Sequence, residues 1–125
     1  MIAIDFGHLC FNSSASEQSI LIVVASKCDF PALDDFIVEA LNFLESDKEF
    51  YDNWNEMYRD RTYLPASDDD IARMKSTLSE MDQRITILYE PITKAVYVVP
   101  PKWNDISLGL ETEKEYIFYL WGTSA

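Results

Sequence analysis

The chain has 125 residues, of which 48% are hydrophobic, and a formal net charge of -12. This length suits one domain, residues 1–125, with a single substantial core, and the apolar content excludes a disordered chain. The acidic balance argues against direct binding of nucleic acid or anionic lipid, because affinity for phosphate depends on Lys and Arg. It favours a basic protein partner.

The start of the chain and its cysteines indicate a compartment. MIAIDFGHLC lacks the basic start and small-residue cleavage site of a signal peptide, and no run reaches the roughly 18 apolar residues of a membrane helix. We therefore expect a cytoplasmic protein. Thiols stay reduced there, so Cys10 and Cys28 are expected to be buried and unbridged.

The first quarter of the chain predicts two strands. Residues 2–11 alternate between two faces, and residues 12–18, NSSASEQ, have the composition of a turn. The run SILIVVAS at residues 19–26 is continuously apolar and rich in β-branched residues. Such a run is typical of a central strand that is covered on both faces.

The middle third changes to a helical period. Apolar residues recur at i, i+3, i+4 and i+7 over residues 31–45, which predicts a first helix. A second helix is expected over 48–60, and a third begins with Ser67 as its N-cap and extends to Met81. The apolar face of the second helix is predicted to consist of Phe50, Trp54, Met57 and Tyr58.

The last third returns to strands. RITILYE at 84–90 and AVYVVP at 95–100 are separated by a short connection and predict a hairpin, while KEYIFYLW at 114–121 predicts an interior strand. The order ββαααβββ implies an α+β fold. We expect an antiparallel or mixed sheet of about five strands, with three helices packed as one layer.

The negative charge is concentrated in the middle of the chain. Residues 29–70 contain thirteen acidic and three basic residues, a net charge of -10, which leaves -2 for the rest. On a helix with about 100° per residue, four carboxylates between 49 and 60 form a stripe opposite the apolar face. Like charges at i, i+4 cost a helix about 0.2–0.5 kcal/mol per pair, so stability alone does not favour this stripe. The alternative is an ordinary solvated face.

We therefore expect a partner-binding surface on the middle helices. The acidic stripe forms its centre, two tyrosines supply aromatic contacts beside it, and further acidic residues form an outer ring. The predicted partner-binding residues are Glu49, Tyr51, Asp52, Glu56, Asp60, Tyr63, Asp34, Asp35, Asp68, Asp69 and Asp70.

Signals for enzyme chemistry are weaker. His8 is the only histidine, which excludes a two-histidine metal site. The sequence contains no Gly-x-Ser-x-Gly, no phosphate-binding glycine loop and no Cys-x-x-Cys. The run at 68–70 is best explained as first-turn acids of a helix. We therefore expect no enzyme activity, no metal and no cofactor.

One short motif nevertheless offers a catalytic alternative. IAIDFG at residues 2–7 resembles the first strand of the RNase H-like and actin-like ATPase superfamilies. The resemblance covers six residues and implies that Asp5 handles a metal or a phosphate. Those families continue with Thr or Ser after the glycine, whereas His8 and Leu9 follow here. This alternative is a metal-dependent nuclease or phosphotransferase organised around Asp5.

The chain as a whole resembles the small acidic immunity proteins of bacterial toxin systems, including those of contact-dependent growth inhibition and colicin-type toxins. The shared features are its size, its acidic middle segment and aromatic residues among the carboxylates, namely Tyr51, Trp54, Tyr58 and Tyr63. This resemblance of class implies a protein that binds and occludes the active site of a cognate basic toxin, typically a nuclease. A DNA-mimicking regulator of a nucleic-acid-binding protein is an alternative that uses the same surface.

Overall fold

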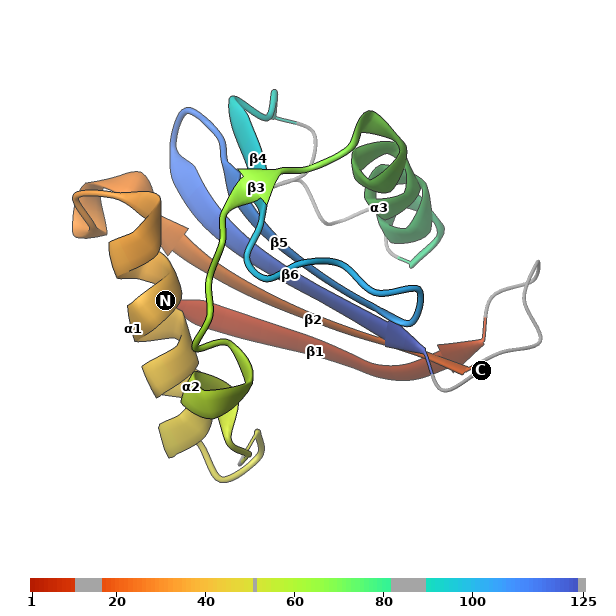
Figure 1. Cartoon of the computed structure of the whole chain (residues 1–125), viewed down its shortest axis with the longest axis horizontal. Helices are drawn as coiled ribbons and strands as arrows, with labels where there is room; N and C mark the ends of the chain where they lie inside the picture. Colours follow the sequence, from red (N-terminus) through yellow and green to blue (C-terminus); the bar gives the residue numbers. More distant parts are fainter. Residues whose placement is uncertain (11–16, 51, 82–89, 124–125) are drawn as a thin grey trace.

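The computed structural model describes residues 1–10, 17–50, 52–81 and 90–123. Its strands are β1 (Ile2–Cys10), β2 (Glu17–Ser26), β3 (Leu64–Pro65), β4 (Lys94–Tyr97), β5 (Asp105–Glu111) and β6 (Glu115–Thr123). Its helices are α1 (Leu33–Ser46), α2 (Trp54–Met57) and α3 (Asp68–Met81), with a short 3-10 turn, η1 (Lys27–Asp29). Within these residues the six strands form one antiparallel sheet in the order β1-β2-β6-β5-β4-β3 (Figure 1). The predicted α+β class is confirmed.

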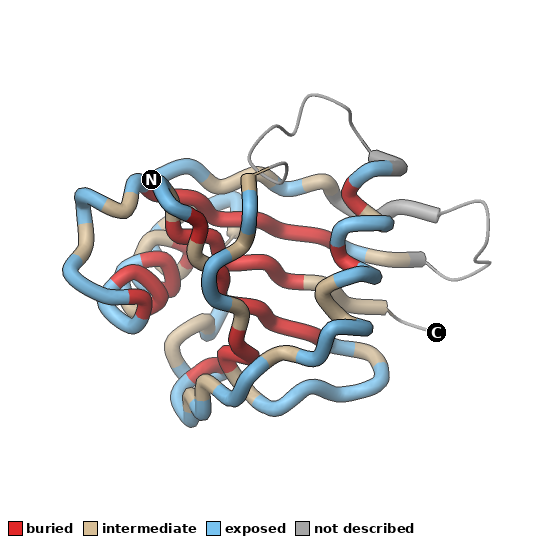
Figure 2. The backbone as a smooth tube through the Cα atoms, turned by 90° about the horizontal axis from the view of Figure 1, so that it is seen from above, coloured by how far each residue is buried: buried red, intermediate tan, exposed pale blue. Residues whose placement is uncertain are grey.

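The centre of the sheet is the pair β2 and β6. These strands pair without interruption from Gln18 opposite Thr123 to Ser26 opposite Glu115. Their middle residues are buried, as the red strands in the interior of Figure 2 show. Successive side chains of a strand point to opposite faces, so both faces of this pair need a cover. The predictions of a doubly covered strand at 19–26 and an interior strand at 114–121 are confirmed.

Helix α1 covers one face of the sheet. It buries the stripe Leu33, Phe36, Ile37, Ala40, Leu41 and Leu44. Phe36 stacks on Tyr116 of β6, with ring centroids 5.6 Å apart. A Cβ atom on Gly109 of β5 would lie 3.3 Å from Cδ2 of Leu33, so the glycine allows close approach of α1. The predicted first helix is confirmed within two residues at each end.

Helix α3 covers the opposite face, where Met74 and Leu78 pack in a second apolar cluster. Ser67 accepts a hydrogen bond from the Asp70 N–H at 3.1 Å, as expected of its N-cap. Figure 1 shows α1 and α2 on one side of the sheet and α3 on the other. The prediction that all three helices form one layer is therefore wrong, because the central strands are apolar on both faces.

The second predicted helix is mostly absent from the described residues of 48–60, since α2 spans only Trp54–Met57. The side chain of Asp47 accepts a hydrogen bond from the Glu49 N–H, and that of Asp52 accepts one from the Asn53 N–H, each at 2.8 Å. Such local bonds compete with helix formation, and this explains the error. Met57 was predicted on the apolar face of this helix, but its side chain is 48% exposed.

The remaining differences concern the strands. Two strands were not predicted, namely β5, which pairs with both β4 and β6, and the two-residue β3 at the sheet edge. Residues 17 and 18, expected in a turn, belong to β2. Most of the strand predicted at 84–90, and with it the predicted hairpin, lies outside the described residues. The predicted strand at 95–100 is shorter in the structure, where β4 ends at Tyr97.

Two smaller expectations can also be compared with the structure. None of the helices in the described ranges has the length and apolar character needed to cross a bilayer. Cys28 lies in η1 as a free, exposed thiol. The prediction that Cys28 is buried is wrong, because the 3-10 turn at the end of β2 buries none of its residues.

Candidate functional site: an acidic groove on the sheet

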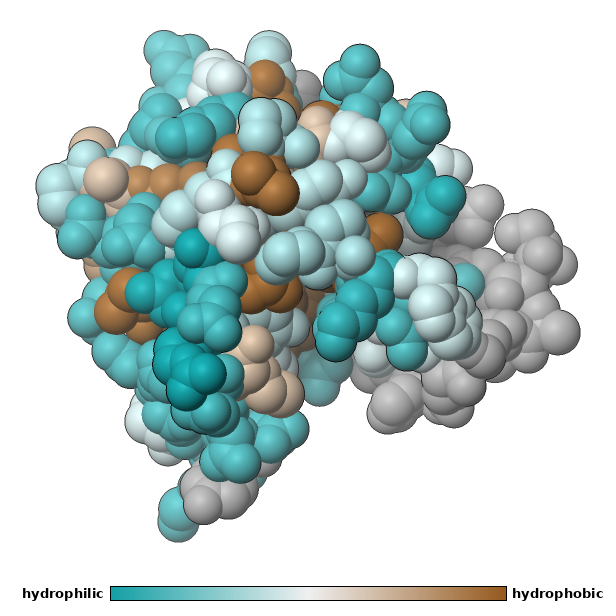
Figure 3. All heavy atoms as spheres, in the orientation of Figure 1, coloured by the Kyte–Doolittle hydropathy of each residue, from teal (hydrophilic) through white to brown (hydrophobic). Residues whose placement is uncertain are grey.

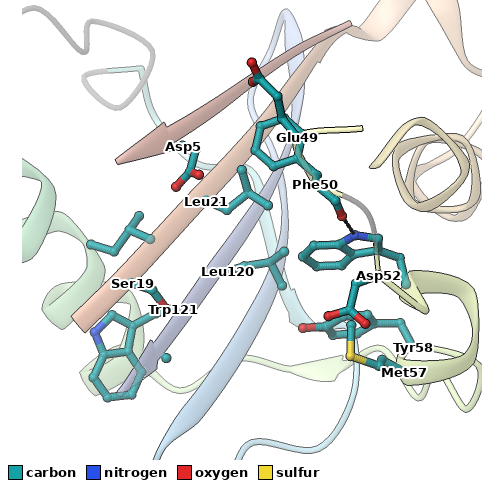
Figure 4. Close-up of a pocket in the computed structure, with 13 residues that line it drawn as sticks. Asp5, Ser19, Leu21, Glu49, Phe50, Asp52, Met57, Tyr58, Leu120 and Trp121 are labelled. Carbon is teal, nitrogen blue, oxygen red and sulfur yellow. Dashed lines mark hydrogen bonds between the residues drawn. The ribbon is translucent and has the colours of Figure 1, made fainter. Parts of the chain in front are cut away.

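A groove of about 490 Å³ is hollowed into the face of the sheet that α1 covers (Figure 4). Its floor comes from β1, β2 and β6, and its wall from the segment that leads from α1 into α2 and Tyr58. Figure 3 shows mostly hydrophilic residues on the α1 side of the molecule, with apolar residues visible in small separate areas. This groove, which we call the acidic groove, is the candidate site.

Strand register builds the floor. Asp5 lies opposite Leu21, and Leu21 lies opposite Leu120, so these three residues form a row across β1, β2 and β6. Leu21 and Leu120 are buried, which makes the middle of the floor apolar. The β1–β2 pairing shifts just beyond Asp5, between Asp5 and His8. Such bulges redirect side chains and are common beside functional sites.

Aromatic rings form the wall. The rings of Trp54 and Tyr58 stack with centroids 6.3 Å apart and planes 10° apart. Tyr58 meets Phe118 of β6 edge-on at 5.7 Å, and the indole N–H of Trp54 donates a hydrogen bond to the Phe50 carbonyl. These contacts anchor the wall to the sheet although α2 itself is a single turn. The four-residue spacing of Phe50, Trp54 and Tyr58 therefore reflects packing against the sheet and not a long helix.

Carboxylates stand around the apolar floor. In Figure 4, Asp5 projects from β1 on one side and Asp52 lies on the other, beside Met57 and Tyr58. Glu49 belongs to the same wall segment as Asp52. None of the described lining residues is basic. Neither Glu49 nor Asp52 forms an ion pair with any residue that the structure describes.

A further carboxylate lies beside the groove on β5. Asp105 is paired with Gly122, a lining residue of β6. Partial desolvation raises the pKa of the Asp105 carboxyl, and the positive charge of Lys102 lowers it by less. Burial raises the pKa of Tyr58, and the negative charge of Asp105 raises it further. The effect on Tyr58 indicates that the Asp105 carboxyl is close to the aromatic wall of the groove.

Other predicted partner-binding residues already have partners within the protein. Arg59 lies 3.2 Å from the Glu56 carboxylate and 3.6 Å from that of Asp60. Arg61 lies 3.2 Å from the Asp34 carboxylate, which also accepts a hydrogen bond from the Tyr63 hydroxyl. The continuous acidic stripe predicted on one helix is therefore not formed. The chain's own arginines partly neutralise these carboxylates.

The outer ring of predicted residues is divided between the two faces. Asp35 is exposed in the first turn of α1, whereas Asp68, Asp69 and Asp70 begin α3 on the opposite face. The Asp70 carboxylate accepts a hydrogen bond from Tyr97 and lies 3.9 Å from Arg73. Tyr51 lies outside the described residues. Of the described members of the predicted set, only Glu49 and Asp52 line the groove.

Sequence reasoning missed the floor and wall of this site as partner-binding elements. The available signal for Asp5 was the alternation in residues 2–11, which places it on the face opposite Ile4 and Phe6. Asp5 is exposed on the edge strand β1, and charged residues are common on edge strands because they hinder pairing with another chain. Across the part of the chain that is described, no group of three or more His, Cys, Asp and Glu residues is placed to hold a metal ion.

We compared the chain with models of protein families, with curated proteins and with solved structures, and none of them matches it. The chemistry of the groove is therefore the basis for inferring its ligand. That chemistry combines carboxylates, stacked aromatic rings and an apolar floor in an open depression, without a basic residue among the described lining residues. A cationic ligand complements such a surface.

Proposed function

We propose that this protein is a non-enzymatic inhibitor of the toxin-immunity class. It binds a basic protein partner, a toxin domain and typically a nuclease, and covers the partner's active site. The acidic groove is the centre of the binding surface, with Glu49 and Asp52 as its principal charged contacts. The observation that carries the proposal is that these two carboxylates border an aromatic depression and have no ion-pair partner among the described residues.

The charge distribution suits this function. A nuclease holds Lys and Arg around its phosphate site, and an array of carboxylates is complementary to these groups. The net charge of -10 over residues 29–70 extends this field beyond the groove. Electrostatic steering of this kind raises association rates to about 10⁸ M⁻¹s⁻¹ at low salt. Rapid capture matters for an inhibitor whose target is toxic in the same cell.

Exposed apolar side chains near the groove support a protein partner. Met57 lines the groove and is 48% exposed. Trp103 is 73% exposed in the β4–β5 connection, next to Asn104, whose carbonyl accepts a hydrogen bond from the Thr123 N–H. That connection therefore lies beside the end of β6 that contributes Gly122 to the groove. Large apolar residues beside unpaired charge are typical of protein interfaces.

The catalytic alternative has one observation in its favour, namely that Asp5 lines the same groove. In that case the protein is a metal-dependent nuclease or phosphotransferase, and Asp5→Asn abolishes a hydrolytic activity measured on nucleic acid or nucleotide in the presence of Mg²⁺. An inhibitor instead shows no such activity before or after the substitution. A DNA-mimicking regulator uses the same groove, but its partner binds nucleic acid without cutting it.

The decisive experiment uses the product of the open reading frame immediately upstream of the gene. We expect this product to be toxic when expressed alone, to be neutralised by co-expression of the present chain, and to bind it in a salt-dependent manner. The double variant Glu49→Gln/Asp52→Asn is expected to bind about 100-fold more weakly, since two charge-assisted contacts of about 1.5 kcal/mol each are lost.

The chain itself supplies a matched control. Glu56→Gln/Asp60→Asn removes the same number of charges from the same segment, but these carboxylates are paired with Arg59. We expect its affinity to stay within about threefold of the parent. Equal losses in both double variants contradict the groove as the binding centre. Failure of the upstream product to bind, or binding unchanged by salt, contradicts the proposed function.

A further inference from the structure

We infer that the acidic groove receives an arginine side chain from the basic partner. This inference rests on the proposed function and specifies the chemistry by which the partner is recognised. It follows from three properties of the groove, namely an apolar floor, a stacked aromatic wall and carboxylates on either side of the floor. An arginine side chain has one part that matches each of them.

The floor suits the aliphatic part of the side chain. Leu21 and Leu120 are adjacent across β2 and β6, and both are buried but still line the groove. Three methylene groups lying along this floor lose contact with water on binding. Long cationic side chains commonly cover apolar surface in this way and keep the charged head in a polar environment. A purely ionic ligand, such as a metal ion, makes no use of the floor.

The wall suits the planar head group. Trp54 is half-buried and lines the groove, with its ring backed by the nearly parallel ring of the buried Tyr58, whose plane is 10° away, and Phe50 lies beside them. A guanidinium group stacks on aromatic rings and is less strongly hydrated than an ammonium group. The anchoring of Tyr58 against Phe118 at 5.7 Å fixes the wall before a ligand arrives. A preorganised wall reduces the entropy lost on binding.

The carboxylates provide the charged contacts. Asp52 and Glu49 line the groove from the wall segment, and Asp105 stands just outside it on β5, opposite the lining residue Gly122. The guanidinium group donates hydrogen bonds in several in-plane directions, so it can serve two carboxylates at once, whereas the ammonium group of lysine is a point charge. The groove volume of about 490 Å³ falls within the usual range for ligand sites and leaves room for the backbone that carries the side chain.

The test uses N-acetyl-arginine-amide as a probe, with the citrulline analogue as a neutral isostere. We expect the arginine probe to shift the indole N–H signal of Trp54 in a ¹H–¹⁵N spectrum in a saturable manner. The expected dissociation constant is about 1 mM, in line with a ligand of this size. The signal of Trp103, which is 73% exposed and borders the groove without lining it, is expected to shift less. The citrulline analogue is expected to give no saturable shift.

Two variants locate the effect. Asp52→Asn is expected to weaken binding of the arginine probe about tenfold, whereas Glu56→Gln, outside the groove, leaves it unchanged within twofold. The Trp54 signal of each free variant shows whether the wall has kept its structure. Equal shifts at Trp54 and Trp103, or equal binding of the arginine and citrulline probes, overturn the inference.

The inference and the proposed function fail separately. If the upstream toxin binds and its affinity depends on Glu49 and Asp52, but the arginine probe does not bind, the function stands and the arginine subsite is wrong. If the probe binds the groove but the upstream product neither binds nor is neutralised, the subsite stands and the immunity function is wrong.

The lysine analogue of the probe tests the preference for a guanidinium group. Binding of the lysine analogue as tight as that of the arginine probe contradicts this preference.

Discussion

The close approach of α1 to the sheet at Gly109 gives a quantitative test of the fold. Gly109→Ala places a Cβ atom 3.3 Å from Cδ2 of Leu33 and 3.5 Å from Cγ2 of Val96. Leu33 is in the first turn of α1 and is buried, so its side chain has little space to retreat. Overpacking of this kind costs about 1–3 kcal/mol, and the lower entropy of unfolded alanine offsets about 0.4–1 kcal/mol. We expect a net loss of about 1 kcal/mol.

Urea unfolding followed by fluorescence measures this loss, with the slope of the transition unchanged. Gly122→Ala is the matched control, because its Cβ atom would lie 3.4 Å from Oγ of Ser19 and 3.6 Å from the Asn104 carbonyl, which are ordinary contacts. We expect Gly122→Ala to be neutral or slightly stabilising. Equal destabilisation by both substitutions refutes the argument that α1 sits against Gly109, because no such crowding exists at Gly122.

Three further predictions concern charge and pH. Burial raises the pKa of Tyr58 and Tyr119 above the usual value near 10. The unfolded chain therefore releases these protons at lower pH than the folded chain, and stability should fall as pH rises beyond about 10. A near-ultraviolet titration is expected to show both tyrosines ionising only on unfolding. Desolvation raises the pKa of Asp105, so its ionised form opposes folding. Asp105→Asn should therefore raise the melting temperature at neutral pH. This gain should shrink as pH falls through the range in which carboxyl groups become protonated. Arg59→Gln releases the Glu56 and Asp60 carboxylates from an exposed ion-pair cluster, so the free energy of unfolding should change by less than about 0.5 kcal/mol. Association with the proposed basic partner should become faster.

The elements that the sequence predicted correctly share a strong and unambiguous period. Residues 19–26 and 114–121 are apolar on both faces, and α1 carries a long apolar stripe, so burial alone decides their structure. The strand β5 was missed although Ile106, Leu108 and Leu110 alternate. Asp105, Ser107 and Gly109 interrupt this pattern with residues that are common in loops. Ser107 is nevertheless buried, because its hydroxyl accepts a hydrogen bond from the Val99 N–H.

The second helix shows the limit of a helical wheel. Phe50, Trp54 and Tyr58 are spaced as on one helical face, and all three do pack toward the core that contains α1. The same spacing is satisfied by a bent segment in which the carboxylates of Asp47 and Asp52 bond to neighbouring backbone N–H groups. A wheel describes apolar spacing and takes no account of this local competition. The predicted stripe therefore overestimated the regularity of the acidic surface.

The site illustrates why a count of charged residues along a sequence differs from the charge that a partner meets. Glu56, Asp60 and Asp34 contribute to the acidic total, but Arg59 and Arg61 lie beside them in the folded chain. Only the fold distinguishes these carboxylates from those of Glu49 and Asp52, which lack an ion-pair partner in the described part of the chain. A carboxylate without an internal ion-pair partner stays solvated until a ligand cation replaces its water, and that exchange is favourable where aromatic walls lower the local polarity. Recognition should therefore depend on the few charges that the fold leaves beside the groove rather than on the acidic total.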